Sequence, residues 1–349
     1  MREQCRVIQP VESRKLRRVG NGMAEKTQRD GERGGLQPDE GASGLVSLAE
    51  ITEAARLLAS VVIRTPLLPI PMLSPDLLVK PESLQPTGSF KLRGAYTAIS
   101  ASGQEAIRRG VIAHSSGNHG HAVAYAAALL GVHAVVVVPS TAPKIKTDAI
   151  EHYGAEVVTV APTLAARVAA TEELVARHGY VLIPPFDDPN VIAGQGTIGL
   201  EIMASQPDTD LILVPVSGGG LISGIAAAIR ASRPGAAVVG VEPELAADAL
   251  RVEQVGVLPF AHLRELVTDI VTVSEDEMLT AVRLLARQAR LVAEPGGAAA
   301  VAAWLFHATE LPAASTPVAV LSGGNIDPGL LARVLATNLP VTTSESLPR

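Results

Sequence analysis

The sequence has almost no cysteine, few aromatic residues and no strong excess of either charge. Its 349 residues include one cysteine, Cys5, so no internal disulfide can form and a reducing cytoplasm is the compartment that fits best. Aromatic residues make up 3% of the chain, which predicts a core built from Ala, Val, Leu and Ile. The net charge of -6 gives no electrostatic reason to expect nucleic acid or a membrane surface as a partner. No apolar run reaches the length of a membrane span.

The remaining composition is typical of a globular protein. Hydrophobic residues make up 47% and charged residues 18% of the chain, which is long enough for one large domain or two smaller ones. Residues 1–44 are rich in Gly, Arg, Glu and Gln without apolar periodicity, so we expect no fixed structure there. We interpret residues 341–349 as a second tail.

From residue 45 onward, short apolar runs alternate with helical patterns. Ser47 and Glu50 form a capping box at a helix start. A short strand is expected at 77–82, and Gly131 ends a helix predicted over 121–130. Further strands are expected at 111–114, 134–138, 157–160, 180–183, 211–214, 238–241 and 318–321. This alternation predicts parallel βαβ units.

The stretch from Pro86 to Ala95 contains a lysine in unusual surroundings. Gly88, Ser89 and Phe90 precede Lys91, and Arg93 follows it. A lysine is usually a solvated surface group. One that is desolvated beside another cation loses its proton easily and can form a Schiff base.

Three further motifs follow expected strands. Residues 115–120 (Ser-Ser-Gly-Asn-His-Gly) precede a helix, so they indicate either an anion site or a plain turn with an N-cap. Glycines 218–220 would let backbone N–H groups converge on a phosphate, and their spacing fits neither the dinucleotide nor the Walker pattern. Residues 322–325 (Ser-Gly-Gly-Asn) alone indicate only a βα turn.

These motifs, in this order, resemble the serine/threonine dehydratase family, the fold type II pyridoxal-phosphate enzymes that include serine racemase. The resemblance runs from about residue 45 to about 339. It implies an α/β fold of two three-layer αβα domains with mostly parallel sheets. A small domain, 110–187, would be inserted into a large domain made of 45–109 and 188–340.

The resemblance also assigns roles to residues. Lys91 would form the Schiff base with pyridoxal phosphate, Asn118 would hydrogen-bond its ring hydroxyl, and Ser322 its pyridine nitrogen. The cofactor-binding set is Phe90, Lys91, Asn118, Ser217, Gly218, Gly219, Gly220, Leu221 and Ser322. The substrate-binding set is Ser115, Ser116, Asn118, His119 and Arg167. Glu294 would lie near the cofactor, behind the residues that touch it.

Ser116 separates two chemistries within the resemblance. In serine racemase the serine at this place is a second acid–base group, whereas many threonine dehydratases have alanine there. Inversion at Cα needs proton transfer on both faces, which a hydroxyl allows. A loop serine also often just satisfies backbone groups.

A divalent metal site belongs to the same resemblance. Glu242, Ala246 and Asp248 fall where related enzymes bind Mg²⁺, Mn²⁺ or Ca²⁺, although two acids at this spacing would otherwise indicate a solvated helix start. After Asp248 a longer family segment is missing. Its loss could open the site, change the substrate or leave a poor catalyst.

We therefore expect a cytoplasmic homodimer or larger homo-oligomer that removes water and ammonia from L-threonine or L-serine. Serine racemase and hydroxyaspartate dehydratase activities are the alternatives. A further alternative is a homologue that binds the cofactor but has only weak activity.

Overall fold

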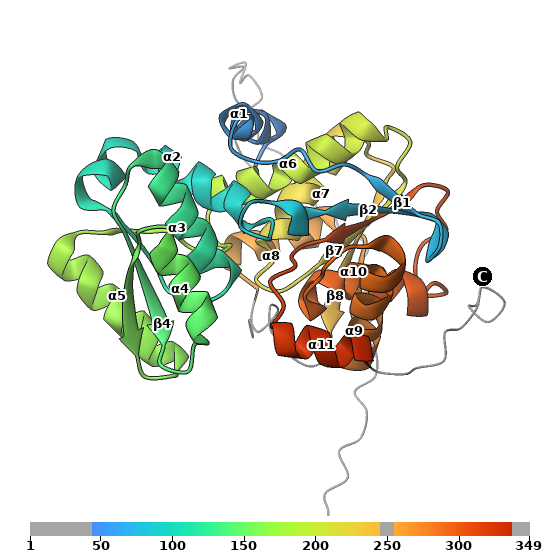
Figure 1. Ribbon diagram of the computed structural model, residues 1–349. Helices are drawn as coiled ribbons and strands as arrows, with labels where there is room; N and C mark the ends of the chain where they lie inside the picture. The colour runs from blue at the N-terminus through green and yellow to red at the C-terminus, as the bar shows by residue number, and fades with distance from the viewer. Residues whose placement is uncertain (1–43, 245–254, 337–349) are drawn as a thin grey trace, which may run out of the picture. The chain divides into compact units, whose positions relative to one another are not determined.

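Helices and strands alternate along the part of the chain that the structure describes. The computed structural model describes residues 44–244 and 255–336 (Figure 1). The predicted tails, 1–44 and 341–349, lie outside these ranges except for Gly44. Helix α1 (Leu48–Leu58) begins at the predicted capping box, where the Ser47 hydroxyl accepts from the backbone N–H of Glu50. The Glu50 carboxylate accepts in return from the Ser47 N–H at 2.7 Å.

One sheet has six strands in the order β1-β2-β10-β7-β8-β9. The strands are β1 (Leu68–Ile70), β2 (Ser74–Pro81), β7 (Leu211–Pro215), β8 (Ala237–Pro243), β9 (Asp269–Val273) and β10 (Pro317–Leu321). Every neighbouring pair is parallel except β1 and β2. The two edge strands, β1 and β9, were not predicted from the sequence.

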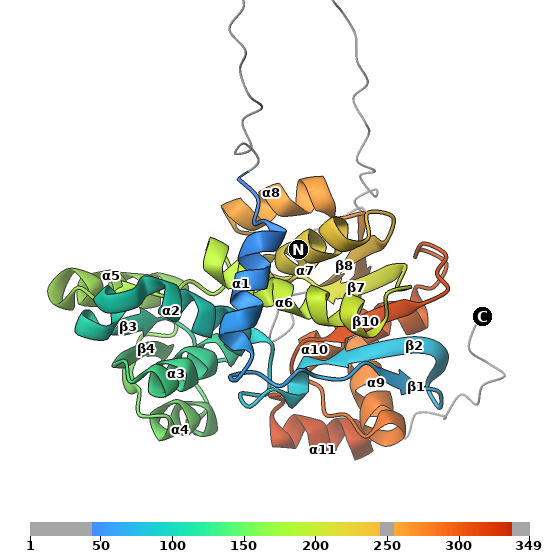
Figure 2. The ribbon, with the colours of Figure 1, turned by 90° about the horizontal axis from the view of Figure 1, so that it is seen from above.

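Alternate side chains of each strand in this sheet pack on opposite faces. Leu211 and Leu213 belong to a core with α9 (Glu275–Leu284), α10 (Pro295–Phe306) and α11 (Pro328–Ala336). Ile212 and Val214 belong to a second core with α6 (Pro189–Ser205), α7 (Gly220–Ser232) and α8 (Val257–Leu266). Figure 2 shows the two groups of helices on either side of the sheet. Between α9 and α10 lies a π-helical turn, η2 (Leu285–Ala289).

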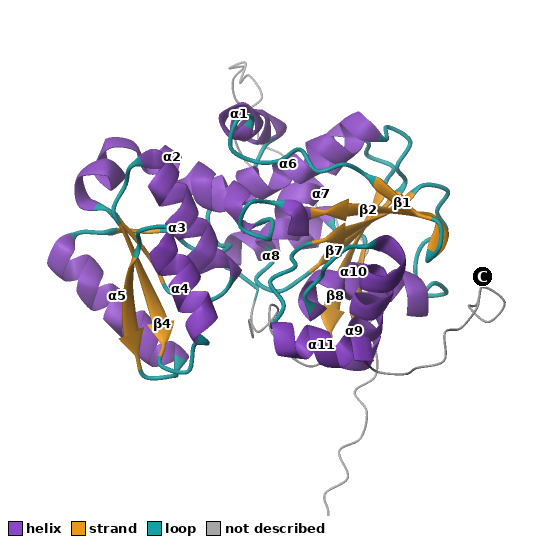
Figure 3. Cartoon of the chain, in the orientation of Figure 1, coloured by secondary structure: helices purple, strands orange, loops and turns teal. Residues whose placement is uncertain are grey.

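The second sheet has four parallel strands in the order β5-β4-β3-β6 (Figure 3). They are β3 (Val111–Ala113), β4 (Ala134–Pro139), β5 (Glu156–Val160) and β6 (Val181–Leu182). One face packs on α2 (Lys91–Arg109), α3 (Asn118–Leu130) and α4 (Lys144–His152), and the other on α5 (Leu164–His178).

Both sheets are thus covered by helices on their two faces, which buries the strands and explains their Val, Ile and Leu content. The predicted class, an α/β fold of two three-layer αβα domains with mostly parallel sheets, is confirmed. The exact domain boundaries stay a prediction. None of the helices in the described ranges combines the length and apolar character needed to cross a membrane.

Candidate active site

Lys91 is the first residue of α2, and its ammonium is withdrawn from water. Strand β2 and the 3₁₀ turn η1 (Glu82–Leu84) lead the chain into this position. Burial lowers the pKa of Lys91 to about 8. Its Nζ donates to the carbonyl of Pro185 at 2.7 Å and lies 5.0 Å from the centroid of the Phe90 ring. About a tenth of Lys91 is therefore an uncharged amine at pH 7, far more than for an ordinary lysine, and the uncharged amine is the form that a nucleophile requires.

The predicted second cation beside Lys91 does not act as expected. Arg93 is fully buried and binds Glu82 through two bonds, Nε to Oε2 at 2.8 Å and Nη2 to Oε1 at 2.9 Å. It also binds Glu201, Nη1 to Oε1 at 2.7 Å, so its charge is already compensated. The prediction that a neighbouring cation lowers the pKa of Lys91 is wrong, because desolvation alone accounts for the shift.

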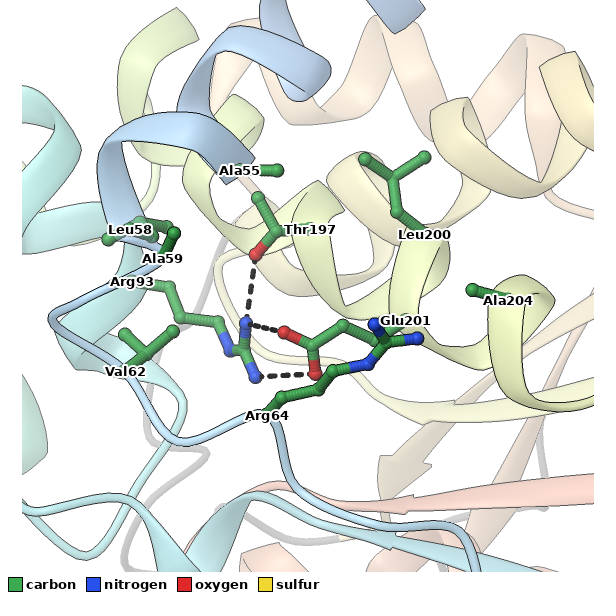
Figure 4. A pocket seen from close by; sticks show the side chains of 10 residues that line it. All are labelled: Ala55, Leu58, Ala59, Val62, Arg64, Arg93, Thr197, Leu200, Glu201 and Ala204. Carbon is green, nitrogen blue, oxygen red and sulfur yellow. Dashed lines mark hydrogen bonds and ion pairs between the residues drawn. The ribbon is translucent and has the colours of Figure 1, made fainter.

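This ion network borders a cavity of about 320 Å³ between α1 and α6 (Figure 4). Arg93, Thr197 and Glu201 are among the residues that line it, and the side chains of Thr197 and Glu201 point toward the guanidinium of Arg93. Lys80 Nζ joins the network at Glu201. Burial by itself raises the pKa of Glu82, but Arg93 outweighs it and holds this pKa below its usual value. The network anchors the start of α2 two residues after Lys91, and sequence reasoning missed it.

The loop between β3 and α3 holds the predicted substrate residues. Ser115 Oγ accepts from the N–H of Gly117 at 3.2 Å, and Ser116 is half-buried in the same turn. His119 is 4% exposed and donates from Nε2 to the carbonyl of Ile183 at 2.8 Å. Burial, and then the charge of Lys91, lower the pKa of His119 to about 3, so this histidine is neutral.

Asn118 lies at the first turn of α3 and connects the two sheets. Its Nδ2 donates to Glu294 Oε1 at 2.6 Å, and its Oδ1 accepts from Asn325 Nδ2 at 2.7 Å. Glu294 follows the π-helical turn and caps α10, while Asn325 follows β10. Glu294 was predicted to lie near the site, and Asn325 was not assigned a role.

The glycine loop joins β7 to α7. Gly219 has a φ of +89°, a left-handed value that favours glycine, and it caps the helix start. The next backbone N–H groups lack partners inside the helix, so they are available to an anion. A β-carbon on Gly218 would overlap the ring of Phe186. Ser217 precedes this turn, and Leu221 packs into the core behind it.

Phe186 links the glycine loop to Lys91. Its backbone neighbour Pro185 accepts the hydrogen bond from Lys91 Nζ. The next residue, Asp187, accepts from the N–H groups of Val257 and Leu258 and caps α8. The segment 185–187 thus contacts the lysine, the glycine loop and α8, and no local sequence pattern indicated this.

The end of β10 closes the site against the lysine loop. The Ser322 carbonyl accepts from the N–H of Phe90 at 3.1 Å, and Ser89 forms an isolated bridge with Gly323. Ser322 is 6% exposed. The hydroxyl of Ser89, directly before Phe90, is buried without a hydrogen-bond partner in the described protein.

Two predicted groups stand apart from these contacts. Arg167 lies on α5. The pKa of His114, at the end of β3, is lowered first by the burial of His114 and then by the charge of Arg167. Glu242 is half-buried at the end of β8, and burial raises its pKa. Ala246 and Asp248, the other predicted metal ligands, lie outside the described residues, as does the segment that follows them. The described ranges contain no cluster of three metal-ligating side chains.

The arrangement fits a phosphorylated aldehyde such as pyridoxal phosphate. A partly buried lysine with a pKa of about 8 supplies the amine, and the glycine loop at the start of α7 supplies donors for a phosphate. Asn118 adds a polar side chain after β3 of one sheet and Ser322 another after β10 of the other, and Ser89 leaves a buried hydroxyl unsatisfied.

Comparison with known proteins agrees with this chemistry. The family profile described as pyridoxal-phosphate dependent enzyme matches residues 58–323. The chain is 39% identical over 321 residues to an L-threonine ammonia-lyase of Thermotoga maritima, covering 84% of this chain and 79% of that protein. It is 37% identical to an L-threo-3-hydroxyaspartate ammonia-lyase of Saccharomyces cerevisiae, covering 80% and 93%.

The fold also matches solved structures. Maize serine racemase superimposes with a TM-score of 0.79 at 33% identity, covering 82% of this chain and 96% of that one. Sequence, fold and the arrangement around Lys91 agree, and the chain belongs to the family of pyridoxal-phosphate-dependent enzymes.

Proposed function

We propose that the protein is an ammonia-lyase that converts L-threonine to 2-oxobutanoate and L-serine to pyruvate, releasing ammonia. The observation that carries this is a partly buried lysine with a lowered pKa joined, through Pro185 and Phe186, to a glycine loop at a helix start. The 39% identity to a threonine ammonia-lyase supports the choice of substrate.

In this proposal the side chains of the site hold the cofactor, move the proton and bind the substrate. Bound pyridoxal phosphate supplies an electron sink for charge that develops at Cα of the substrate. Lys91 would hold the cofactor aldehyde until the substrate amine displaces it. The freed Nζ would then accept the Cα proton and pass a proton to the β-hydroxyl, which would leave as water. Phe90 borders Lys91. Ser322 would hydrogen-bond the pyridine nitrogen of the cofactor without holding it protonated, and Asn118 would hydrogen-bond its ring oxygen. The phosphate is assigned to Ser217, Gly218, Gly219, Gly220 and Leu221. The substrate carboxylate is assigned to Ser115, Ser116, Asn118 and His119.

A panel of β-hydroxy amino acids tests the proposal. Purified holoenzyme is given L-threonine, L-serine and L-threo-3-hydroxyaspartate, and the keto acid and ammonia are measured. With threonine and with serine, we expect the keto acid and ammonia to be released in equal amounts. The Lys91→Ala variant should release neither. A protein that binds the cofactor but releases neither product from any of the three would be the weak homologue that the missing segment after Asp248 suggests.

Serine racemisation is the second candidate function. Ser116 supplies a hydroxyl in the carboxylate loop, and the fold matches maize serine racemase. A hydroxyaspartate substrate is favoured by a different feature, Arg167 beside His114, because an arginine binds a second carboxylate well. The same panel separates these substrates.

Three further assignments are proposals of the same kind. A divalent ion at Glu242, Ala246 and Asp248 predicts loss of activity and thermal stability on chelation and recovery with Mg²⁺ or Ca²⁺. A homodimer or larger oligomer predicts at least twice the chain mass by light scattering. A cytoplasmic location, with no nucleic-acid partner, rests on the single cysteine and the acidic charge.

A further inference from the structure

Asn118 and Asn325 form a short hydrogen-bonded chain whose two ends both require a donor. At one end Asn325 Nδ2 donates to the carbonyl of Thr87 at 2.8 Å, and at the other Asn118 Nδ2 donates to Glu294 Oε1 at 2.6 Å. Between them, Asn325 Nδ2 donates to Asn118 Oδ1 at 2.7 Å. A backbone carbonyl only accepts, so the Thr87 carbonyl requires the NH₂ of Asn325 on its side, and the same NH₂ then requires the oxygen of Asn118.

Rotating the Asn118 amide by half a turn would break both of its hydrogen bonds, because donor would face donor and acceptor would face acceptor. Its oxygen would face the carboxylate of Glu294, and its NH₂ would face the NH₂ of Asn325. Glu294 is 7% exposed, so water cannot easily replace the lost partners. Groups left unsatisfied in such a place are strongly disfavoured.

The surrounding backbone leaves these side chains little room to move. Gly88 has a φ of +72°, and a β-carbon there would overlap the Asn325 side chain. A β-carbon on Gly323 would overlap the carboxylate of Glu294 and lie 3.2 Å from Asn118 Nδ2. Two glycines therefore allow three motifs to approach one another: the lysine loop, the end of β10 and the start of α3.

We propose that Asn325 and Glu294 are positioning residues that hold Asn118 in one amide orientation. One N–H of Asn118 is occupied by Glu294, and the second is left for the ring oxygen of the cofactor. The inference rests on the proposed function, which assigns Asn118 to that oxygen. A fixed donor at this place favours the anionic form of the ring oxygen, and this form sets the visible absorbance of the bound cofactor.

A double-mutant cycle tests the proposal with cofactor affinity and absorbance as readouts. Asn325→Asp keeps the shape but presents only acceptors to the Thr87 carbonyl and to Asn118 Oδ1. Asn325→Ala removes the donor without adding a charge. We expect each variant to weaken pyridoxal phosphate binding to apoenzyme by about tenfold and to alter the pH dependence of the visible absorbance. In the Asn118→Ala background the same changes should have less than about a twofold effect.

Two controls separate positioning from general damage. Asn190→Asp adds the same charge at the start of α6, outside the site, and should leave affinity within about twofold. Glu294→Gln keeps an acceptor oxygen and should retain more affinity than Glu294→Ala. If the Asn325 variants weaken binding equally with and without Asn118, the positioning role is overturned while the proposed function stands. If Asn118→Ala itself keeps wild-type affinity and absorbance, the assigned cofactor contact is overturned, and this inference with it.

Discussion

At the scale of single residues, the burial of Lys91 sets the pH at which it reacts. With a pKa of about 8, about a tenth of its side chains are uncharged at pH 7, and the fraction rises about tenfold per pH unit below the pKa. We expect the rate of pyridoxal phosphate attachment to apoenzyme to rise between pH 6.5 and 8 (roughly the range around the lowered pKa) and to level off above it. The rate is followed by stopped-flow absorbance.

Lys91→Ala is the control for this pH profile, because it retains the exposed Lys144, whose pKa is raised by its hydrogen bond with Asp148. That variant should show only slow attachment that continues to accelerate beyond pH 9 (about one unit above the Lys91 midpoint). If the rate for the wild type also rose only beyond pH 9 (about one unit above the Lys91 midpoint), the pKa of Lys91 would not be lowered as described.

Ser116 decides between elimination and racemisation. A proton delivered to the face of Cα opposite Lys91 needs a second group, and Ser116 is assigned to it. We predict slow racemisation of serine beside elimination, with Ser116→Ala losing at least about tenfold more racemase activity than lyase activity. Chiral analysis of recovered serine and deuterium incorporation at Cα measure both. Efficient elimination by the wild type without any D-serine would reduce Ser116 to a carboxylate-loop hydroxyl.

At the scale of elements, the buried charges tie β2, η1, α2 and α6 together. Glu82 is fully buried and accepts two bonds from Arg93, so removing it leaves charge uncompensated inside the protein. We expect Glu82→Ala to destabilise the fold by about 3–5 kcal/mol, measured by urea unfolding. The pKa of Glu82 in the folded protein is held below its usual value. Glu82 therefore contributes fully to the free energy of unfolding at a pH above the usual value, and this contribution is lost as the pH falls through the lowered pKa.

The exposed pair of Glu53 and Arg56 on α1 provides the matched control, since both side chains are more than two thirds exposed. Glu53→Ala should change stability by less than about 1 kcal/mol. Equal effects of the two glutamate variants would contradict the account of the buried network.

At the scale of the whole molecule, local signals predicted most of the fold. The capping box at Ser47, the glycine stop at Gly131 and the alternation of apolar runs depend on neighbours within a few residues, and the structure reproduces each. The short edge strands β1 and β9 were missed because β1 is a three-residue, proline-containing run and β9 alternates between exposed and buried positions.

The sequence motifs of the site were predicted. The contacts between residues far apart in the sequence were not. Arg93 pairs with Glu201, 108 residues away, and Asn325 bonds with Asn118, 207 residues away. No single sequence reveals which of many acids or amides will meet across such separations. This is why Arg93 was assigned to Lys91 incorrectly and why Asn325 received no role.

The most direct test of the central claim locates the lysine that carries the cofactor. Holoenzyme is reduced with borohydride, digested, and the modified peptide is identified by mass spectrometry. The account predicts the pyridoxyl group on Lys91 at close to one per chain, with loss of the visible absorbance and of keto-acid release. Modification of Lys80, Lys144 or Lys146 in place of Lys91, or full activity after reduction, would contradict it.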